Sequence, residues 1–156
     1  MLIRKARFED FDRIVNFNIQ MAEVTEGKIL DSNVAREGVK TVLGNESKGF
    51  YLLAEDEKGA KILGQLMVTF EWSDWRNKNI WWMQSVYVDK QYRNKRVFSR
   101  LYETVVKMAL SKKSVGGLRL YVEKHNESAK RVYESLGMKK APYEIYEKSL
   151  EAHADM

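Results

Sequence analysis

The strongest constraint on this chain is a strand–helix–strand pattern in its second half. An apolar run over residues 80–88 leads through a polar, basic turn into a helical pattern. The apolar face of that helix consists of Val97, Leu101, Val105 and Met108. Gly116 and Gly117 then lead into a second strand, predicted over Leu118 to Val122. A strand that returns through a helix to another strand forms a crossover within one sheet, so the chain is predicted to be an α/β protein.

The first half of the chain predicts three further strands and two helices. The strands cover residues 2–6, 50–54 and 62–70. The first helix has the apolar face Phe11, Ile14, Val15, Ile19 and Ala22. The second helix is capped near Asp31 and runs to about Leu43. This half is therefore mostly antiparallel sheet with a helical pair.

The end of the chain predicts one more helix and one more strand. The helix carries Ala129, Val132, Tyr133 and Leu136 on one face and is closed by Gly137. Residues 143–147 have a strand pattern. The complete expected order is β-α-α-β-β-β-α-β-α-β.

Composition limits the classes of protein to which the chain can belong. Its 156 residues suggest a single domain over residues 1–150, with a loose tail at 151–156. It has no cysteine and two histidines, so we expect no disulfide and no metal site. No apolar run approaches the roughly 18 residues that span a bilayer, and the N-terminus does not resemble a signal peptide, so we expect a cytoplasmic protein without membrane contact. The net charge of +5 favours an anionic ligand without identifying it.

The turn before the central helix, within the segment VDKQYRNKRVFSRLY (residues 88–102), is unusually basic and contains no glycine. Arg93, Lys95, Arg96 and Arg100 surround the predicted start of the helix. A helix start offers N–H groups and a partial positive charge to a phosphate, although glycine usually lets the backbone approach the ligand. The turn is interpreted either as a phosphate site or as a solvated basic helix start.

Three motifs resemble those of the GNAT acyltransferase superfamily. The first is the strand SVYVD (residues 85–89) followed by YRNKRVF (92–98), which resembles the family's pyrophosphate loop. The second is EKHNESAKRVYESLGM (123–138), with Asn126, Ala129, Tyr133 and Gly137 in the family's positions. The third is EWSDWR (71–76), which together with VFSRLY (97–102) is similar to one subgroup. The chain departs from the family where Arg96 and Phe98 replace its glycines.

The resemblance implies a mixed, centrally splayed sheet flanked by helices, and acetyl transfer from acetyl-CoA to an amine that attacks the thioester directly. It implies that a backbone N–H near Val88 stabilises the oxyanion. The implied cofactor-binding residues are Val86, Tyr87, Val88, Arg93, Asn94, Lys95, Arg96, Val97, Phe98, Ser99, Asn126 and Tyr133.

The resemblance also suggests catalytic and substrate-binding residues. Tyr133 would protonate the leaving thiolate, as in the family. Gln84 stands where many family members place an acid and cannot act as a base, so Glu71, or as a second choice Asp74, would take a proton from the amine. Both carboxylates could instead only bind the substrate cation or cap the turn. The substrate-binding residues would be Glu23, Glu26, Glu71, Trp72 and Asp74. Other interpretations stay open: Tyr133 could be a core aromatic, Asn126 a helix cap, and the tryptophans core residues or a homodimer face.

Two other functions compete with acetyl transfer to a small or protein amine. One is a module of the same fold that binds CoA weakly or not at all because Arg96 blocks the loop. The other is a basic nucleic-acid-binding domain. We expect no nucleic-acid partner, because the excess of positive charge is small and no nucleic-acid-binding motif is present.

Overall fold

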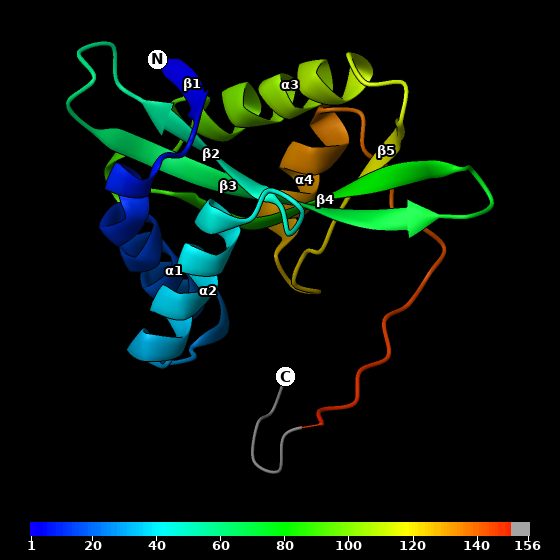
Figure 1. Ribbon diagram of the computed structural model, residues 1–156, viewed down its shortest axis with the longest axis horizontal. Helices are drawn as coiled ribbons and strands as arrows, with labels where there is room; N and C mark the ends of the chain where they lie inside the picture. The colour runs from blue at the N-terminus through cyan, green and yellow to red at the C-terminus, as the bar shows by residue number, and fades with distance from the viewer. Residues whose placement is uncertain (151–156) are drawn as a thin grey trace. The chain divides into compact units, whose positions relative to one another are not determined.

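The computed structural model describes residues 1–150 (Figure 1), so the loose tail expected at 151–156 lies outside the described residues. The chain divides into two compact units, Met1–Tyr121 and Val122–Met156. Within residues 1–150, no helix combines the length and the apolar composition that crossing a bilayer requires.

The first unit is built on a mixed sheet whose strands follow chain order. These are β1 (Leu2–Lys5), β2 (Phe50–Glu55), β3 (Ile62–Ser73), β4 (Lys78–Val88) and β5 (Val115–Leu120). The pairings from β1 to β4 are antiparallel, and β4 pairs with β5 in parallel. The parallel pair is joined by α3 (Val97–Leu110), which confirms the predicted crossover.

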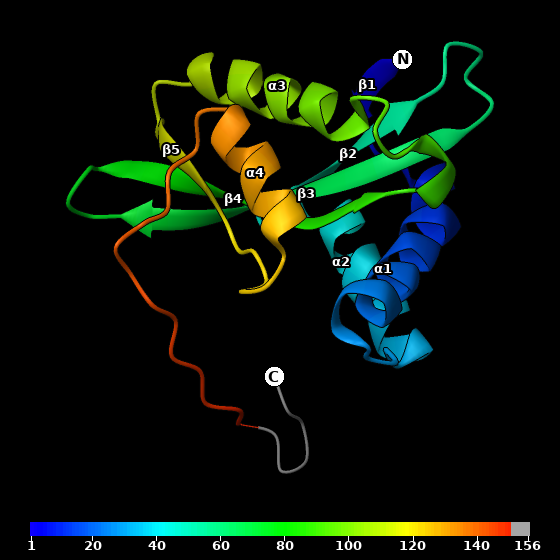
Figure 2. The ribbon, with the colours of Figure 1, turned by 180° about the vertical axis from the view of Figure 1, so that it is seen from behind.

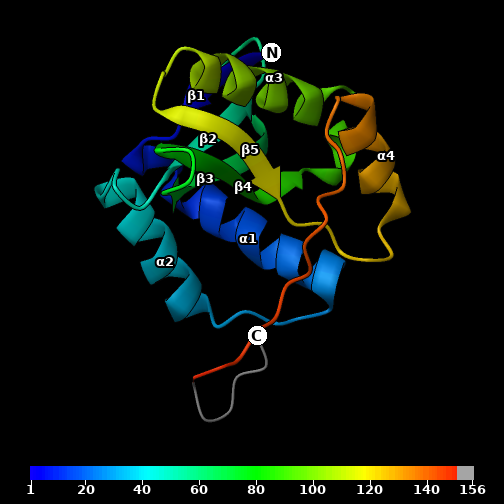
Figure 3. The same ribbon diagram turned by 90° about the vertical axis from the view of Figure 1, so that its right-hand side faces the viewer.

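Helices cover both faces of this sheet, as the edge-on view in Figure 3 shows. On one side lie α1 (Phe11–Glu26) and α2 (Ser32–Gly44), where Ile14, Val15 and Val39 join Tyr51 and Leu53 in a buried cluster. On the other side lies α3, whose buried residues Val97, Leu101, Val105 and Ala109 repeat at helical spacing. The predicted cap of α2 is confirmed, because the Asp31 carboxylate accepts hydrogen bonds from the N–H groups of Asn33 and Val34.

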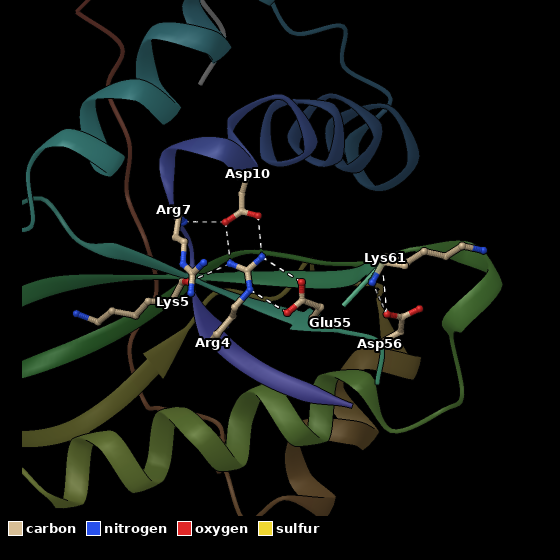
Figure 4. A network of polar contacts seen from close by, with 8 residues as sticks. Arg4, Lys5, Arg7, Asp10, Glu55, Asp56 and Lys61 are labelled. Carbon is tan, nitrogen blue, oxygen red and sulfur yellow. Dashed lines mark hydrogen bonds and ion pairs between the residues drawn. The ribbon is translucent and has the colours of Figure 1, made fainter. Parts of the chain in front are cut away.

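A polar network ties β1 and the turn before α1 to β2 (Figure 4). The Arg4 guanidinium donates to the two carboxylate oxygens of Asp10 at 2.8 and 2.9 Å, and to Glu55 at 3.0 Å. Asp10 also accepts the Arg7 N–H at 2.7 Å. Arg4 holds the pKa of Asp10 below its usual range through these hydrogen bonds.

The boundaries of β5 differ from the prediction. We expected the strand at residues 118–122, after a glycine turn, but it covers Val115–Leu120 and includes both glycines. A Cβ at Gly116 would lie 3.2 Å from the Lys78 Cβ, and a Cβ at Gly117 would lie 3.6 Å from the Ile80 Cδ1. Gly116 therefore allows β5 to approach the start of β4 closely, whereas Gly117 has room for a Cβ, and both glycines lie in the strand rather than in a turn.

The second unit contains α4 (Glu127–Ser135), which Figure 2 shows from behind. The helix starts at Asn126, whose side chain accepts the Ala129 N–H at 3.1 Å, and ends before Gly137, which has φ +87°. The predicted strand at residues 143–147 is wrong: the described chain has no strand after α4. Tyr143, Ile145 and Tyr146 are all exposed, and a strand pattern without a pairing partner does not make a strand.

Candidate active site

The sheet opens along the second half of β4. The pairing with β5 runs from Asn79–Val115 to Met83–Leu120 and then stops. On its other side, β4 stays paired with β3 as far as Val88, opposite Gly64. In the part of the chain that the structure describes, residues 84–88 therefore have a neighbouring strand on one side only, which confirms the expected central splay.

A β-bulge lies at the start of this opening. Gln65 pairs with Tyr87 and Met67 pairs with Gln84, so Ser85 and Val86 together oppose the single residue Leu66. Ser85 has φ +48°, in the left-handed region that residues with a Cβ rarely adopt. The bulge resets the direction of the backbone for the last residues of β4.

The bulge directs backbone N–H groups toward the open side. The Asp89 N–H donates to the Leu63 carbonyl oxygen of β3 at 3.0 Å. Because N–H directions alternate along a strand, the Tyr87 N–H also points toward β3, and those of Val86 and Val88 point away from it. Two amides on one strand thus face the side that β5 has left.

The turn from β4 into α3 has a strained backbone. Asp89 starts the short 3-10 helix η2 (Lys90–Tyr92) by accepting the Gln91 N–H, and its carboxylate pairs with Arg13 at 2.9 Å. Asn94 and Arg96 then both have φ +60°. The left-handed conformation therefore occurs at Arg96 without glycine.

Among the described residues, Arg96 does not cap the start of α3 with its side chain. Arg96 precedes the helix, makes no side-chain capping bond, and accepts the Arg100 N–H on its carbonyl at 3.1 Å. The N–H groups of the first turn therefore point out of the helix end, the arrangement that binds phosphate in many proteins. Val97 is buried, whereas Phe98 and Ser99 are half-buried in this turn. Since Phe98 lies within the helix, its position does not require the left-handed conformation.

The basic side chains of the turn have local partners. The Arg93 Nε donates to the Val88 carbonyl at 3.2 Å, and the Lys95 Nζ lies 5.3 Å from the centre of the Tyr92 ring. The Arg96 guanidinium lies 3.7 Å from Glu103, with 78% of the Arg96 side chain exposed. Its side chain therefore extends along α3 rather than over the helix start.

Two predicted cofactor residues belong to the second unit. Asn126 is the cap of α4, which is one of the two roles expected for it. Tyr133 lies in the middle of α4 and is half-buried, and this burial raises the pKa of its hydroxyl. A tyrosine hydroxyl, with an ordinary pKa of about 10, carries its proton at neutral pH whether or not it is buried.

Glu71 is held in a network across three strands. Its carboxylate accepts the Trp82 Nε1–H at 2.5 Å and pairs with the Arg119 guanidinium, which lies 3.1 Å from both oxygens. Glu71 pairs with Ile80, five residues before Ser85 on β4. At a strand rise of about 3.3 Å per residue, this separation is about 16 Å. Glu71 is thus not brought together with the open amides.

Trp72 and Asp74 also lie away from the opening. They are at the far end of the β3–β4 hairpin, which projects beyond the neighbouring strands in Figure 1. Trp72 is 59% exposed, and the neighbouring Trp75 is 91% exposed. The Asp74 carboxylate accepts the Trp75 N–H at 2.9 Å, so Asp74 shapes the turn.

Glu23 lines a half-open cleft of about 360 Å³ at the end of β4. The other lining residues are Gln20, Val24, Tyr87, Asp89, Lys90 and Gln91. The Tyr87 hydroxyl donates to the Gln20 Oε1 at 2.8 Å and so ties β4 to α1. Glu26 is turned to Lys28, 3.3 Å away. A larger hollow of about 560 Å³ is lined by the N-terminus and the β2–β3 turn, and no residue of β4 or α3 lines it.

Gln20 and Gln65 both contact the β4 segment and are not among the predicted site residues. Gln65 is fully buried, and its side chain donates to the Ser85 carbonyl at 3.3 Å. An amide in the otherwise apolar run ILGQLMVTF (residues 62–70) was the available signal. Gln20 carried no comparable signal, because polar residues are common on the outer face of an amphipathic helix.

Residues 13–138 match the model of the acetyltransferase (GNAT) family. The structure of a possible acetyltransferase from Clostridium difficile 630 is 45% identical with a TM-score of 0.89, and the match covers 96% of this chain and 97% of that one. The thialysine N-epsilon-acetyltransferase of Bos taurus is 28% identical over 145 residues, 88% of this chain and 83% of the bovine protein.

More distant structures share the fold alone. Glucosamine-6-phosphate N-acetyltransferase from Arabidopsis thaliana is 18% identical with a TM-score of 0.70, and the match covers 96% of this chain and 98% of that one. The family match spans most of the chain and includes the opened strand and the basic turn. On this evidence the chain belongs to the GNAT family of N-acetyltransferases.

Proposed function

We propose that this protein transfers an acetyl group from acetyl-CoA to a primary amine. The observation that carries the proposal is the position of two features within one unit. The amides of Val86 and Val88 face the open side of β4, and the uncapped start of α3 follows a few residues later. Membership of the GNAT family implies an acyl-CoA donor, and the choice of acetyl-CoA is part of the proposal.

The residues of the turn suit such a donor. The first turn of α3 offers N–H groups to the pyrophosphate, and Arg93, Lys95, Arg96 and Arg100 supply positive charge. The Val86 and Val88 amides would hydrogen-bond the pantetheine arm and the thioester oxygen, which becomes more negative in the transition state. Acetyl-CoA supplies the activated acyl group.

The reaction needs two proton transfers. The amine nitrogen attacks the carbonyl carbon and loses a proton, the C–S bond breaks, and the thiolate leaves with the electron pair. We assign the acceptance of the amine proton, directly or through water, to Glu23, which lines the cleft beside Tyr87. Glu71 is less suited, because Arg119 and Trp82 already engage its carboxylate. Tyr133 would protonate the thiolate, which is the role that the family resemblance gives to this residue.

The acceptor is proposed to be a small molecule with a primary amine. The carboxylate of Glu23, in a cleft of modest volume beside β4, suits a single ammonium group. The name of the bovine relative also points to the side-chain amine of an amino acid, although at 28% identity this stays a proposal here.

The test is a screen of amines with the full chain and acetyl-CoA, measured by the release of CoA thiol. The panel contains thialysine, lysine, spermidine and glucosamine 6-phosphate. We expect saturable turnover with at least one of them, and a thermal shift with acetyl-CoA. A thermal shift without turnover on any amine would favour the CoA-binding module. A shift with DNA or RNA but none with acetyl-CoA would favour the nucleic-acid-binding domain.

A further inference from the structure

Gln65 is an unusual residue for the centre of a sheet. It is fully buried in β3, and its Nε2 donates to the Asn18 Oδ1 at 2.7 Å and to the Ser85 carbonyl at 3.3 Å. Its Oε1 is buried and has no hydrogen-bond partner among the described residues. Burying an unpaired carbonyl oxygen costs free energy, and an apolar side chain of similar size would avoid that cost. The presence of an amide at this position is therefore explained by the groups to which its nitrogen donates hydrogen bonds.

Gln65 holds both sides of the β-bulge. Its backbone pairs with Tyr87, just after the bulge, and its side chain donates to the carbonyl of Ser85, within the bulge. From Gln84 onward β4 has no pairing with β5, so within residues 1–150 its one paired strand is β3. A single residue thus sets the path of the backbone on both sides of Val86.

Neighbouring elements hold the Gln65 amide in turn. The Asn18 Nδ2 of α1 donates to the hydroxyl of the buried Tyr51 of β2 at 3.2 Å. Burial raises the pKa of Tyr51, while hydrogen bonds with Asn18 and with the Ser85 side chain act in the opposite direction. The bulge is therefore connected through side chains to α1, β2 and β3, and these contacts restrain Ser85 at φ +48°.

We propose that Gln65 is a positioning residue that fixes the Ser85 bulge and thereby aims the Val86 and Val88 amides at the acyl group. This inference rests on the proposed acetyl transfer. Gln65 does not touch the reacting atoms. Without its side chain, the bulge loses its hydrogen bond from β3, and the two amides sample other directions. The start of α3, which would bind the pyrophosphate, is a separate element with its own contacts.

The experiment compares Gln65→Leu, Gln65→Glu and the wild type, with Val39→Ala as a control for lost stability. Val39 is buried between α2 and β2 and takes no part in the Gln65 hydrogen bonds. For Gln65→Leu we expect kcat to fall at least tenfold, the Kd for CoA to stay within twofold, and any preference for acetyl-CoA over CoA to disappear. A buried carboxyl group stays protonated at low pH and can donate one bond, so the rate of Gln65→Glu relative to the wild type is expected to rise as the pH falls.

A second measurement does not depend on turnover. Amide hydrogen exchange over residues 84–88, without ligand, is expected to accelerate in Gln65→Leu and not in Val39→Ala. The inference would be overturned if Gln65→Leu had the same kcat and the same amide exchange rates as the wild type. It would also be overturned if Gln65→Leu lost no more kcat than Val39→Ala does. If the wild type acetylates no amine, the proposed function fails, and unchanged exchange would still refute the positioning role.

Discussion

Replacing Arg96 by glycine tests whether the turn before α3 stores strain. Arg96 has φ +60° and ψ +19°, and this left-handed conformation costs a residue with a Cβ about 1–2 kcal/mol. Glycine removes that cost but loses about 0.5–1 kcal/mol through the greater freedom of the unfolded chain. The ion pair with Glu103, whose side chain is 41% exposed, contributes little. We therefore expect Arg96→Gly to raise the free energy of unfolding by about 0.5–1 kcal/mol.

Two neighbouring substitutions act as controls in the same thermal unfolding assay. For a chain of this size, the expected gain raises Tm by about 1–4 °C. Lys95 is not among the described residues with positive φ, so Lys95→Gly gains no relief and is expected to lower stability. Arg96→Ala keeps the Cβ and the strain, so its Tm should stay near that of the wild type. A Tm for Arg96→Gly at or below that of Arg96→Ala would refute the argument from strain.

Arg96→Gly should have the opposite effect on cofactor binding. The Arg96 guanidinium is mostly exposed and only loosely paired with Glu103, so it can turn toward a phosphate at little cost. A charge-assisted hydrogen bond contributes about 1.5–3 kcal/mol, and its loss weakens binding roughly tenfold or more. Calorimetry with CoA and dephospho-CoA would locate the contact: an equal loss indicates the pyrophosphate, and a loss for CoA alone indicates the 3′-phosphate. Tighter binding of both ligands would mean that Arg96 obstructs the loop.

Three further changes test the frame of the fold and the proposed proton transfers. Asp10→Asn is expected to lower the free energy of unfolding at pH 7 by roughly 1.5–3 kcal/mol in a urea titration, because it removes the charge that faces Arg4. Since the folded-state pKa of Asp10 is depressed, this stabilisation is present above about pH 4 and is lost as the pH falls through that pKa. A constant difference in the free energy of unfolding between wild type and Asp10→Asn as the solution is made acidic would contradict this. Tyr133→Phe should lower kcat by up to about 100-fold and leave acetyl-CoA affinity nearly unchanged, whereas wild-type turnover with rate-limiting chemistry would make Tyr133 a core aromatic. Glu23→Gln should lower kcat/KM by about 100-fold and shift its pH profile, while Glu71→Gln, the matched control, should change it less than threefold; the reverse order would restore Glu71 as the base.

The parts of the fold that depend on local patterns could be predicted from the sequence. The helices, the strands up to β4 and the Asp31 cap follow from apolar spacing and capping residues within a few positions. The GNAT fold was recognisable because its motifs at residues 85–98 and 123–138 are contiguous in the chain.

The details that depend on distant residues could not be predicted in this way. The Ser85 bulge arises from the register between β3 and β4, and nothing near Ser85 in the sequence indicates it. Glu71 looked like an available carboxylate because its partner Arg119 lies 48 residues away. The strand predicted at residues 143–147 failed for a related reason, since an alternating pattern cannot supply the neighbour with which a strand must pair.

The positions that break local rules lie close together in this molecule. In the part of the chain that the structure describes, the non-glycine residues with positive φ are Asn77, Ser85, Asn94 and Arg96. Asn77 lies in the β3–β4 turn, where asparagine tolerates this conformation, but the other three fall between residues 85 and 96. The Gln65 side chain, whose amide oxygen has no partner among the described residues, donates a hydrogen bond to the carbonyl of Ser85. Stability alone would favour glycine at Arg96 and an apolar residue at position 65. Arg96 lies in the segment from Ser85 to the start of α3, and Gln65 donates a hydrogen bond to that segment. Unfavourable conformations and unpaired polar groups are expected to cluster where function fixes the geometry of the backbone. They indicate the same segment as the family motif at residues 85–98, and this indication does not depend on the motif.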